Sequence, residues 1–146
     1  MKKNINIRKI SIADAAAICE INSEGLGYKC ELSLVQGKIK NLNSQREAVF
    51  VAEADGQVVG NIHVERYDVL YFETMANVLG LSVKIEFQKI GIGRALLEAA
   101  ENWALENGIK MMRLNSGINR TEAHKFYEHL GYVSEKDQKR FIKKLT

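Results

Sequence analysis

The segment between residues 77 and 116 constrains the fold more than any other. "NVLGLSVKI" (77–85) has the mostly apolar pattern of a buried strand, and apolar residues then recur at helical spacing from Ile92 to the stop signal Asn107-Gly108. "IKMMRLNS" (109–116) again has the pattern of a strand. A strand–helix–strand unit of this length places its two strands in parallel, with the helix packed on one face of their sheet.

Hydrophobic alternation and turn residues predict the remaining elements. Asp55-Gly56 separates two β-rich runs and is the strongest hairpin signal in the chain. The other patterns predict strands at 5–10, 48–54 and 57–67, helices from Ser11 to about Asn22, at 31–42 and at 119–130, loops at 23–28 and 68–76, and two final strands around Asp137-Gln138. The predicted fold class is α/β (α+β), with a central mixed, mostly antiparallel sheet, parallel strands 4 and 5, and helices on both faces.

Length and composition predict one domain, residues 1–146. The chain is 46% apolar, which suffices for one sizeable core, and its 146 residues leave little room for a second. No apolar run approaches the ~18 residues of a membrane span, and the basic start never becomes a signal-peptide core, so we expect a cytoplasmic protein that binds no membrane. Cys19 and Cys30 lack CxxC spacing and partnering histidines, so we expect two free thiols and no metal site.

Charge is unevenly distributed along the chain. Residues 41–83 carry two Lys/Arg against six Asp/Glu, whereas residues 84–146 carry twelve against eight. This asymmetry suggests that the last part faces an anion and the middle part a cation. Ordinary solvated faces would give the same counts, so that explanation stays open.

Two glycines at the start of the helix in the crossover unit mark a candidate anion site. The first N–H groups of a helix have no partner inside it, and the helix dipole adds partial positive charge there. Gly91 and Gly93 permit positive φ, so a phosphate oxygen can come close to the backbone. Nearby, Gln88 offers an amide donor, and Lys89 and Arg94 add positive charge.

The spacing excludes two familiar nucleotide sites. A Walker loop ends in GK[ST], but Arg94 and Ala95 follow Gly93 here. A dinucleotide fingerprint needs a third small residue where this chain has Leu96. A tight turn with close helix packing would also explain two glycines, so GxG alone leaves both explanations open.

Over a longer stretch, the sequence resembles the GCN5-related N-acetyltransferase (GNAT) family. Its signatures are Q/R-x-x-G-x-G/A and, farther on, N-x-x-A-x-x-F-Y-x-x-x-G-F/Y. The first is present at residues 88–93, and the second is present as Asn119, Ala123, Phe126-Tyr127 and Gly131-Tyr132. The predicted element order is also that of the family. The resemblance therefore spans essentially the whole chain and implies the acyl-CoA N-acyltransferase fold.

The resemblance implies acetyl-CoA as the acetyl donor. Its pyrophosphate would lie at the two glycines, and its pantetheine arm would lie beside a bulge in the fourth strand, where Gly80 makes a distortion plausible. The expected cofactor-binding residues are Leu81, Ser82, Val83, Gln88, Lys89, Gly91, Ile92, Gly93, Arg94, Asn119 and Tyr127.

The same resemblance implies an N-acetyltransferase that moves the acetyl group directly to a primary amine, without an acyl-enzyme. The sequence agrees, because it contains no serine elbow and no Cys/His nucleophile pair. Tyr127 is the expected acid for the departing thiolate, since a phenol near pKa ~10 can protonate a thiolate. The backbone N–H of Val83 is the expected oxyanion donor.

Deprotonating the acceptor requires a base. A lysine-like amine at pH 7 must lose a proton at a cost of about 4.6 kcal/mol unless a base relieves it. We expect Glu73 to be that base, because it lies in the acidic middle segment and leads into the fourth strand. Glu65, Asp68 and His63 are the alternatives.

The acceptor is expected to be a small cationic amine, such as an aminoglycoside-like or polyamine-like molecule. Glu24, Tyr28, Glu65 and Asp68 are its predicted binding residues. A peptide N-terminus or a lysine is an alternative acceptor. A non-catalytic acyl-CoA sensor and a nucleic-acid-binding domain are rivals of other classes, although we expect no nucleic-acid partner. The sequence leaves a homodimer open.

Overall fold

The computed structural model describes residues 4–146. The chain forms two compact units, Met1–Leu114 and Asn115–Thr146. The first unit contains β1 (Ile5–Lys9), a 3-10 turn (Ile12–Asp14), α1 (Ala15–Leu26), α2 (Leu32–Lys40), β2 (Glu47–Ala54), β3 (Gln57–Tyr67), β4 (Met75–Val83), a second 3-10 turn (Ile85–Phe87), α3 (Ile92–Glu106) and β5 (Met112–Leu114). The second unit contains α4 (Thr121–His129).

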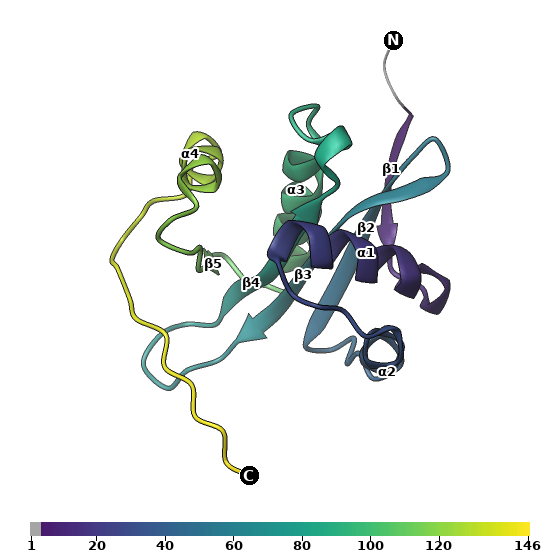
Figure 1. Cartoon of the computed structure of the whole chain (residues 1–146). Coiled ribbons are helices and arrows are strands. Elements are labelled where there is room, and N and C mark those ends of the chain that lie inside the picture. Colours follow the sequence, from purple (N-terminus) through teal and green to yellow (C-terminus); the bar gives the residue numbers. More distant parts are fainter. Residues whose placement is uncertain (1–3) are drawn as a thin grey trace. The chain divides into compact units, whose positions relative to one another are not determined.

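The first unit is built on a five-stranded sheet in the order β1-β2-β3-β4-β5 (Figure 1). Neighbouring strands from β1 to β4 run antiparallel, and β4 and β5 run parallel. The hairpin predicted at Asp55-Gly56 joins β2 to β3. The mixed sheet with its one parallel pair confirms the predicted fold class.

Helices α1 and α3 cover opposite faces of the sheet (Figure 1). Consecutive residues of a strand point to opposite faces. On β3, the Asn61 amide donates to Asn22 Oδ1 of α1 at 3.0 Å, whereas a side chain at Gly60 would meet Leu96 of α3 at 3.1 Å. Helix α2 lies beside α1 on its side of the sheet (Figure 1). The prediction of helices on both faces is therefore confirmed.

Helix α3 contributes more buried residues to the core than α1 does. The apolar residues that recur at helical spacing from Ile92 are half-buried at Ala99 and buried at Ile92, Leu96, Ala100, Trp103 and Ala104, and Leu97 is also buried. This stripe fixes the rotation of α3 on the sheet and hence the direction of its first turn. Among the residues that the structure describes, no helix has the length and apolar character needed to cross a bilayer.

Helix α1 continues through four residues that the sequence predicted as loop. The prediction of a loop at 23–28 is wrong for residues 23–26, because Gly25 lies inside the helix and only Gly27, with φ +75°, ends it. Gly25 has a packing role. A Cβ at this position would lie 2.0 Å from Ser82 Oγ of β4, so any side chain here would force the Ser82 hydroxyl to move.

Strands β4 and β5 differ most from the predicted ranges. Strand β4 covers 75–83 instead of 77–85, because Met75 and Ala76 extend the ladder opposite Tyr67 and Arg66 of β3. Strand β5 has three residues instead of the predicted eight at 109–116, since it pairs with β4 only opposite residues 76–78.

The two final strands predicted around Asp137-Gln138 are absent from the described residues. The structure assigns no helix or strand to residues 133–146. Phe141 and Ile142 are 87% and 82% exposed. Two consecutive apolar residues point to opposite sides of an extended chain, so this segment offers no single apolar face to a sheet.

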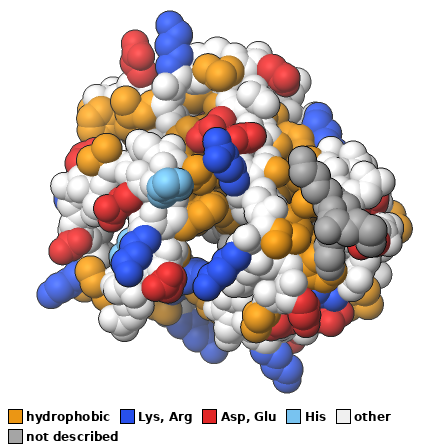
Figure 2. Space-filling view, turned by 90° about the horizontal axis from the view of Figure 1, so that it is seen from above, with side chains coloured by type: hydrophobic (Ala, Val, Ile, Leu, Met, Phe, Trp, Pro, Cys, Tyr) orange, Lys and Arg blue, Asp and Glu red, His pale blue; other side chains and the backbone are white. Residues whose placement is uncertain are grey.

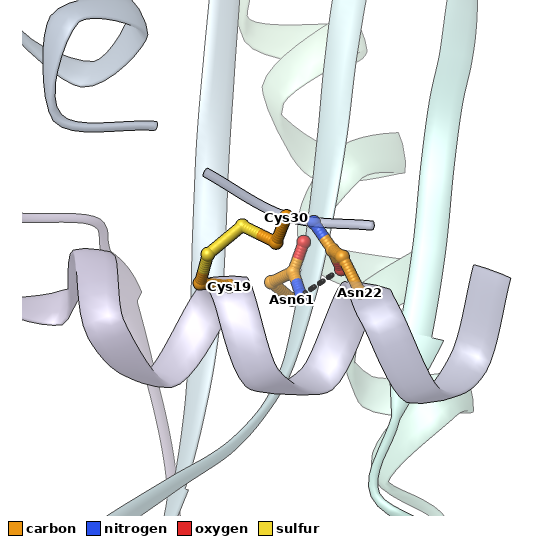
Figure 3. Close-up of a disulfide and its surroundings, with 4 residues drawn as sticks. All are labelled: Cys19, Asn22, Cys30 and Asn61. Carbon is orange, nitrogen blue, oxygen red and sulfur yellow. Dashed lines mark hydrogen bonds between the residues drawn. A yellow bond between two sulfur atoms is a disulfide. The ribbon is translucent and has the colours of Figure 1, made fainter. Parts of the chain in front are cut away.

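Cys19 and Cys30 form a disulfide, so the prediction of two free thiols is wrong. Cys19 lies on α1, and the segment after Gly27 turns back so that the two Cα atoms lie 5.3 Å apart (Figure 3). The Asn22–Asn61 hydrogen bond lies next to the disulfide in the same view. The covalent bond thus ties the segment that follows α1 to the middle of that helix.

A charged cluster fixes the start of α1 to β1. Arg8 donates from Nη1 and Nη2 to the two carboxylate oxygens of Asp14, each at 2.8 Å, and from Nε to Glu53 at 2.7 Å. Asp14 also accepts the Ser11 N–H at 2.8 Å, which agrees with the predicted helix start at Ser11. The bonds from Arg8 contribute most to lowering the pKa of the buried Asp14 carboxyl, against the opposing effect of burial.

We predict that Asp14→Asn lowers the free energy of unfolding by about 1.5–3 kcal/mol at pH 7, because charged hydrogen bonds are lost. A carboxyl whose folded pKa is depressed stabilises the fold above its unfolded pKa and loses this effect as the pH falls through the folded pKa. The difference between wild type and variant should therefore shrink below about pH 4. Urea unfolding across this range measures it, with Asp137→Asn as a surface control. A difference that is constant with pH would contradict the assignment.

We predict that Gly25→Ala destabilises the protein by about 1–3 kcal/mol, because the added methyl overlaps Ser82 Oγ. The matched control is Gly37→Ala in α2, where an added Cβ meets nothing within 4 Å and should stabilise by about 0.5–1 kcal/mol. Adding Ser82→Ala to Gly25→Ala should restore stability, since only Ser82 Cβ, at 3.4 Å, then remains in contact. Thermal unfolding of the four proteins decides, and a double variant no more stable than Gly25→Ala would refute the packing role.

Candidate active site

One edge of β4 is open over its second half. The strand pairs with β3 along its whole length, but with β5 only at Ala76–Val78. In the ladder with β3, His63 faces Gly80 and Val64 faces Val78, so Leu79 is an extra residue. This bulge lies two residues before the predicted site at 81–83. In the part of the chain that the structure describes, β4 has no strand partner on this side at 79–83, so an extended ligand can bond to its backbone.

The first turn of α3 follows this edge and carries free backbone donors. Gly91 caps the helix with φ +95°, and Ala95 donates the first main-chain bond of the helix to the Gly91 carbonyl at 3.0 Å. The N–H groups of residues 92–94 therefore have no acceptor within the helix. A dipole end with three such donors attracts an anion.

The turn at residues 89–91 and the first turn of α3, residues 92–94, together form the candidate anion site, which we call the cradle. Its backbone differs from the prediction at one glycine. Gly93 lies within α3 and does not adopt positive φ, so that part of the prediction is wrong. Lys89 adopts the left-handed conformation instead, with φ +65°, two residues before Gly91. Left-handed residues in such a turn redirect successive N–H groups, which is how short loops form concave anion sites.

Two of the predicted polar residues form contacts within the protein. The Gln88 amide donates to the Val83 carbonyl at 2.9 Å and so ties the cradle to the end of β4. Arg94 pairs with Glu98 one turn later, at 3.0 Å, and both side chains are exposed. An exposed pair of this kind is weak, so Arg94 can turn to another anion at little cost.

A polar cluster lies on the α1 face of the sheet, beyond the end of that helix. It consists of Glu47, His63, Glu65, Asn77 and Arg113, which we call the polar floor. His63 Nε2 lies 2.7 Å from Glu47 Oε1. Asn77 donates to Glu65 at 2.9 Å and accepts from Arg113 at 2.9 Å, so one hydrogen-bonded row crosses three strands.

The pKa of the Glu47 carboxyl lies below its ordinary value. Partial burial opposes this shift, but the N–H of Asn43 and the imidazole of His63 both bond to the carboxylate and outweigh burial. Glu47 is therefore ionised at neutral pH and can only accept hydrogen bonds.

The predicted acceptor residues lie in three places. Glu24 and Tyr28 are exposed at the end of α1 and just after it. Glu65 belongs to the polar floor. Asp68 accepts from Thr74 at 2.5 Å and pairs with Arg46 at 3.2 Å, and these contacts, the Thr74 bond first, lower its pKa. Glu73 is exposed in the loop before β4, two residues before the strand begins and six residues before Leu79.

The second unit carries the remaining predicted residues. Asn119 is exposed in the turn before α4, and Tyr127 lies on the half-buried side of that helix. The Tyr127 ring contacts those of Phe126 and Tyr132, at centroid distances of 5.2 and 6.0 Å. Burial raises the pKa of the Tyr127 phenol, and the positive charge of Arg120 opposes this only in part. The hydroxyl is therefore protonated at neutral pH.

The sequence patterns did not indicate that Glu47, Asn77 and Arg113 belong to one cluster. A signal existed in β3, where Asn61, His63 and Glu65 alternate with apolar residues. Alternating polar residues on a central strand indicate a polar face that must be satisfied by its neighbours. The partners on β2, β4 and β5 depend on strand register, which one sequence does not determine.

Charges of both signs are mixed over the surface shown in Figure 2, with hydrophobic side chains between them. Recognition of a charged ligand on that face therefore depends on individual groups and not on a field of one sign. Among the described residues, no three His, Cys, Asp or Glu side chains gather closely enough to hold a metal ion.

Comparisons with known proteins agree with this arrangement. Residues 45–134 match the family model described as "Acetyltransferase (GNAT) domain". An uncharacterized N-acetyltransferase of Chlorobaculum tepidum is 33% identical over 129 residues, which cover 86% of this chain and 74% of the relative. An aminoglycoside N(6')-acetyltransferase type 1 of Stenotrophomonas maltophilia is 30% identical over 131 residues, covering 86% and 84%.

A solved structure shows the same fold. The aminoglycoside N-acetyltransferase AAC(6')-Iy in complex with CoA has a TM-score of 0.85 and 18% identity, with 100% of this chain and 98% of that chain covered. The family match covers more than half of the sequence, and the fold agrees with it. The chain therefore belongs to the GNAT family of acetyl-CoA-dependent N-acetyltransferases.

Proposed function

We propose that this protein transfers the acetyl group of acetyl-CoA directly to a primary amine of a small cationic molecule. The observation that carries the proposal is the continuity of two binding features. The open edge of β4 at 79–83 leads within a few residues to the donors at the start of α3. The open edge of β4 suits an extended arm that contains amides, and the donors at the start of α3 suit a diphosphate.

The residues present fit CoA. N–H groups of residues 92–94 and the left-handed turn at Lys89 and Gly91 would hold the pyrophosphate. The unpaired backbone of β4 would hold the pantetheine arm, with Leu81, Ser82 and Val83 contributing main-chain groups. The Ser82 side chain points instead toward α1, where its hydroxyl donates to the Ile21 carbonyl at 3.4 Å. Acetyl-CoA supplies an activated thioester carbonyl, so no covalent nucleophile of the protein is required.

The polar floor supports a cationic acceptor. Glu47 and Glu65 present two carboxylates on the face where an amine would reach the open edge of β4 from the α1 side. Glu24 and Tyr28 at the end of α1 can contact more distant parts of the acceptor. An aminoglycoside N(6')-acetyltransferase among the relatives acts on a molecule of this class. A peptide amine is the alternative acceptor.

We propose Tyr127 as the acid and Asn119 as a second contact to the pantetheine arm. The raised pKa of Tyr127 keeps its proton available at neutral pH, and a thiolate is basic enough to take it. The main-chain N–H of Val83, four residues beyond the bulge at Leu79, would stabilise the developing negative charge on the carbonyl oxygen.

We predict that wild type consumes acetyl-CoA with at least one amine of a panel comprising sisomicin, spermidine and a short peptide with a free N-terminus. Gly91→Glu should abolish CoA binding, because a carboxylate then occupies the anion site. Gly108→Glu is the matched control at the other end of α3. It has the same need for positive φ, at +73°, and the same open space around the Cβ. Calorimetric titration with CoA measures binding, and Gly91→Glu that binds like Gly108→Glu would refute the cradle.

We predict that Tyr127→Phe lowers kcat by about 10²–10⁴-fold and leaves the Kd for CoA within about twofold, because it removes only a proton donor. Tyr132→Phe, which removes the hydroxyl of the neighbouring ring, should keep kcat near that of wild type. Steady-state kinetics at pH 7 on the best amine of the panel provides the comparison. Unchanged kcat in Tyr127→Phe would exclude the acid role.

A further inference from the structure

We propose that His63 is the base that takes the proton of the acceptor amine and that Glu47 positions it. This inference rests on the proposed acetyl transfer and deepens it. Its basis is the 2.7 Å contact between His63 Nε2 and Glu47 Oε1 on the polar floor, beside the bulge of β4.

The contact defines which imidazole nitrogen can act. Glu47 is ionised at neutral pH and can only accept, so Nε2 of His63 carries the hydrogen in this bond. In a neutral imidazole, Nδ1 is then unprotonated and able to accept a proton. The carboxylate fixes the tautomer and stabilises the imidazolium that forms, which is the role of the acid partner in other carboxylate–histidine pairs.

His63 lies close to the open edge of β4. Its cross-strand neighbour is Gly80, the residue that follows the bulge at Leu79. Neighbouring strands are about 4.8 Å apart, so the His63 backbone is one strand spacing from the backbone that would hold the thioester arm. Gly80 has no side chain to separate the two. His63 itself is one-third exposed, so its ring is accessible from the α1 face.

The alternative bases are less suited by their contacts. Asp68 is already engaged by Arg46 and Thr74. Glu73 belongs to an exposed loop far along the strand from the bulge. Glu65 accepts from Asn77, which in turn accepts from Arg113, so its carboxylate is already engaged in a hydrogen-bonded row.

Charged groups also lie on the elements that neighbour this pair. Strand β2 contributes Glu47, with Arg46 just before it paired to Asp68. On β3, Glu65 lies two residues farther along the same face. Helix α1 carries Glu20, which pairs with Lys84 just after the end of β4 at 3.8 Å, and the exposed Glu24. On β4, the neighbours of His63 are Gly80 and the neutral Asn77, the latter bonded to Arg113 of β5. Glu47 and Glu65 are the carboxylates beside His63 on this face, and they can attract an ammonium group.

The acceptor reaches the site as an ammonium ion and gives one proton to Nδ1 of His63. The amine lone pair forms the C–N bond to the acetyl carbon as the C–S bond breaks, and sulfur leaves with the electron pair. The thiolate takes a proton from Tyr127, and the second proton of the former amine is lost to solvent. Imidazolium and phenolate then return to their resting states by exchange with water.

The test compares His63→Gln, Glu47→Gln and the control His129→Gln, an exposed histidine of α4. The acceptor is the panel amine that wild type acetylates fastest. His63→Gln should lower kcat about 100-fold at pH 7 with unchanged Kd for CoA. The deficit should shrink as the pH approaches the pKa of the amine, because the acceptor then arrives without its extra proton. Glu47→Gln should give a smaller deficit with the same trend, and His129→Gln none.

The outcomes separate this inference from the proposed function. His63→Gln with the kcat of wild type would overturn the base assignment, and so would a deficit that is the same at every pH, since that marks a structural role. If His63→Gln does not fold, Glu47→Gln decides by the same criteria. Wild type that transfers acetyl to no panel amine would overturn the proposed function, and this inference with it.

Discussion

Strands β4 and β5 are joined over only three residue pairs, and the extra residue Leu79 then ends the regular ladder. Backbone groups of a strand need hydrogen-bond partners, so the unpaired edge at 79–83 is a place where an extended ligand gains bonds that the sheet does not supply. The next helix starts within ten residues of this edge, and the N–H groups of its first turn have no acceptor within the helix. The acetyl-CoA site that we propose depends on the parallel pair ending where it does.

The two helices that flank this edge hold it for different reasons. Helix α3 is fixed by its buried stripe, so its dipole end keeps one direction relative to β4. Helix α1 packs directly on β4 through Gly25, and the disulfide ties the following segment to the same helix. Disulfides persist mainly in oxidising compartments. The disulfide therefore gives no support to the predicted cytoplasmic location, which stays a prediction.

The sequence was informative where a local pattern determines the structure. The helical stripe from Ile92, the hairpin at Asp55-Gly56 and the capping position of Gly91 depend on neighbours in the chain, and all three were predicted. It was less informative where a distant contact decides. Gly25 looked like a loop residue because its partner, Ser82, is 57 positions away. The Glu47–His63 contact depends on the register of β2 and β3. The left-handed conformation of Lys89 depends on closure of the cradle.

The central claim is that the backbone of β4 and the first turn of α3 bind CoA together. Titrating ¹⁵N-labelled protein with CoA and following the backbone amide resonances by NMR tests it most directly. The account predicts saturable shifts at residues 79–83 and 89–94 with one common Kd. Shifts confined to other segments, or shifts at only one of the segments 79–83 and 89–94, would contradict the claim that both bind CoA.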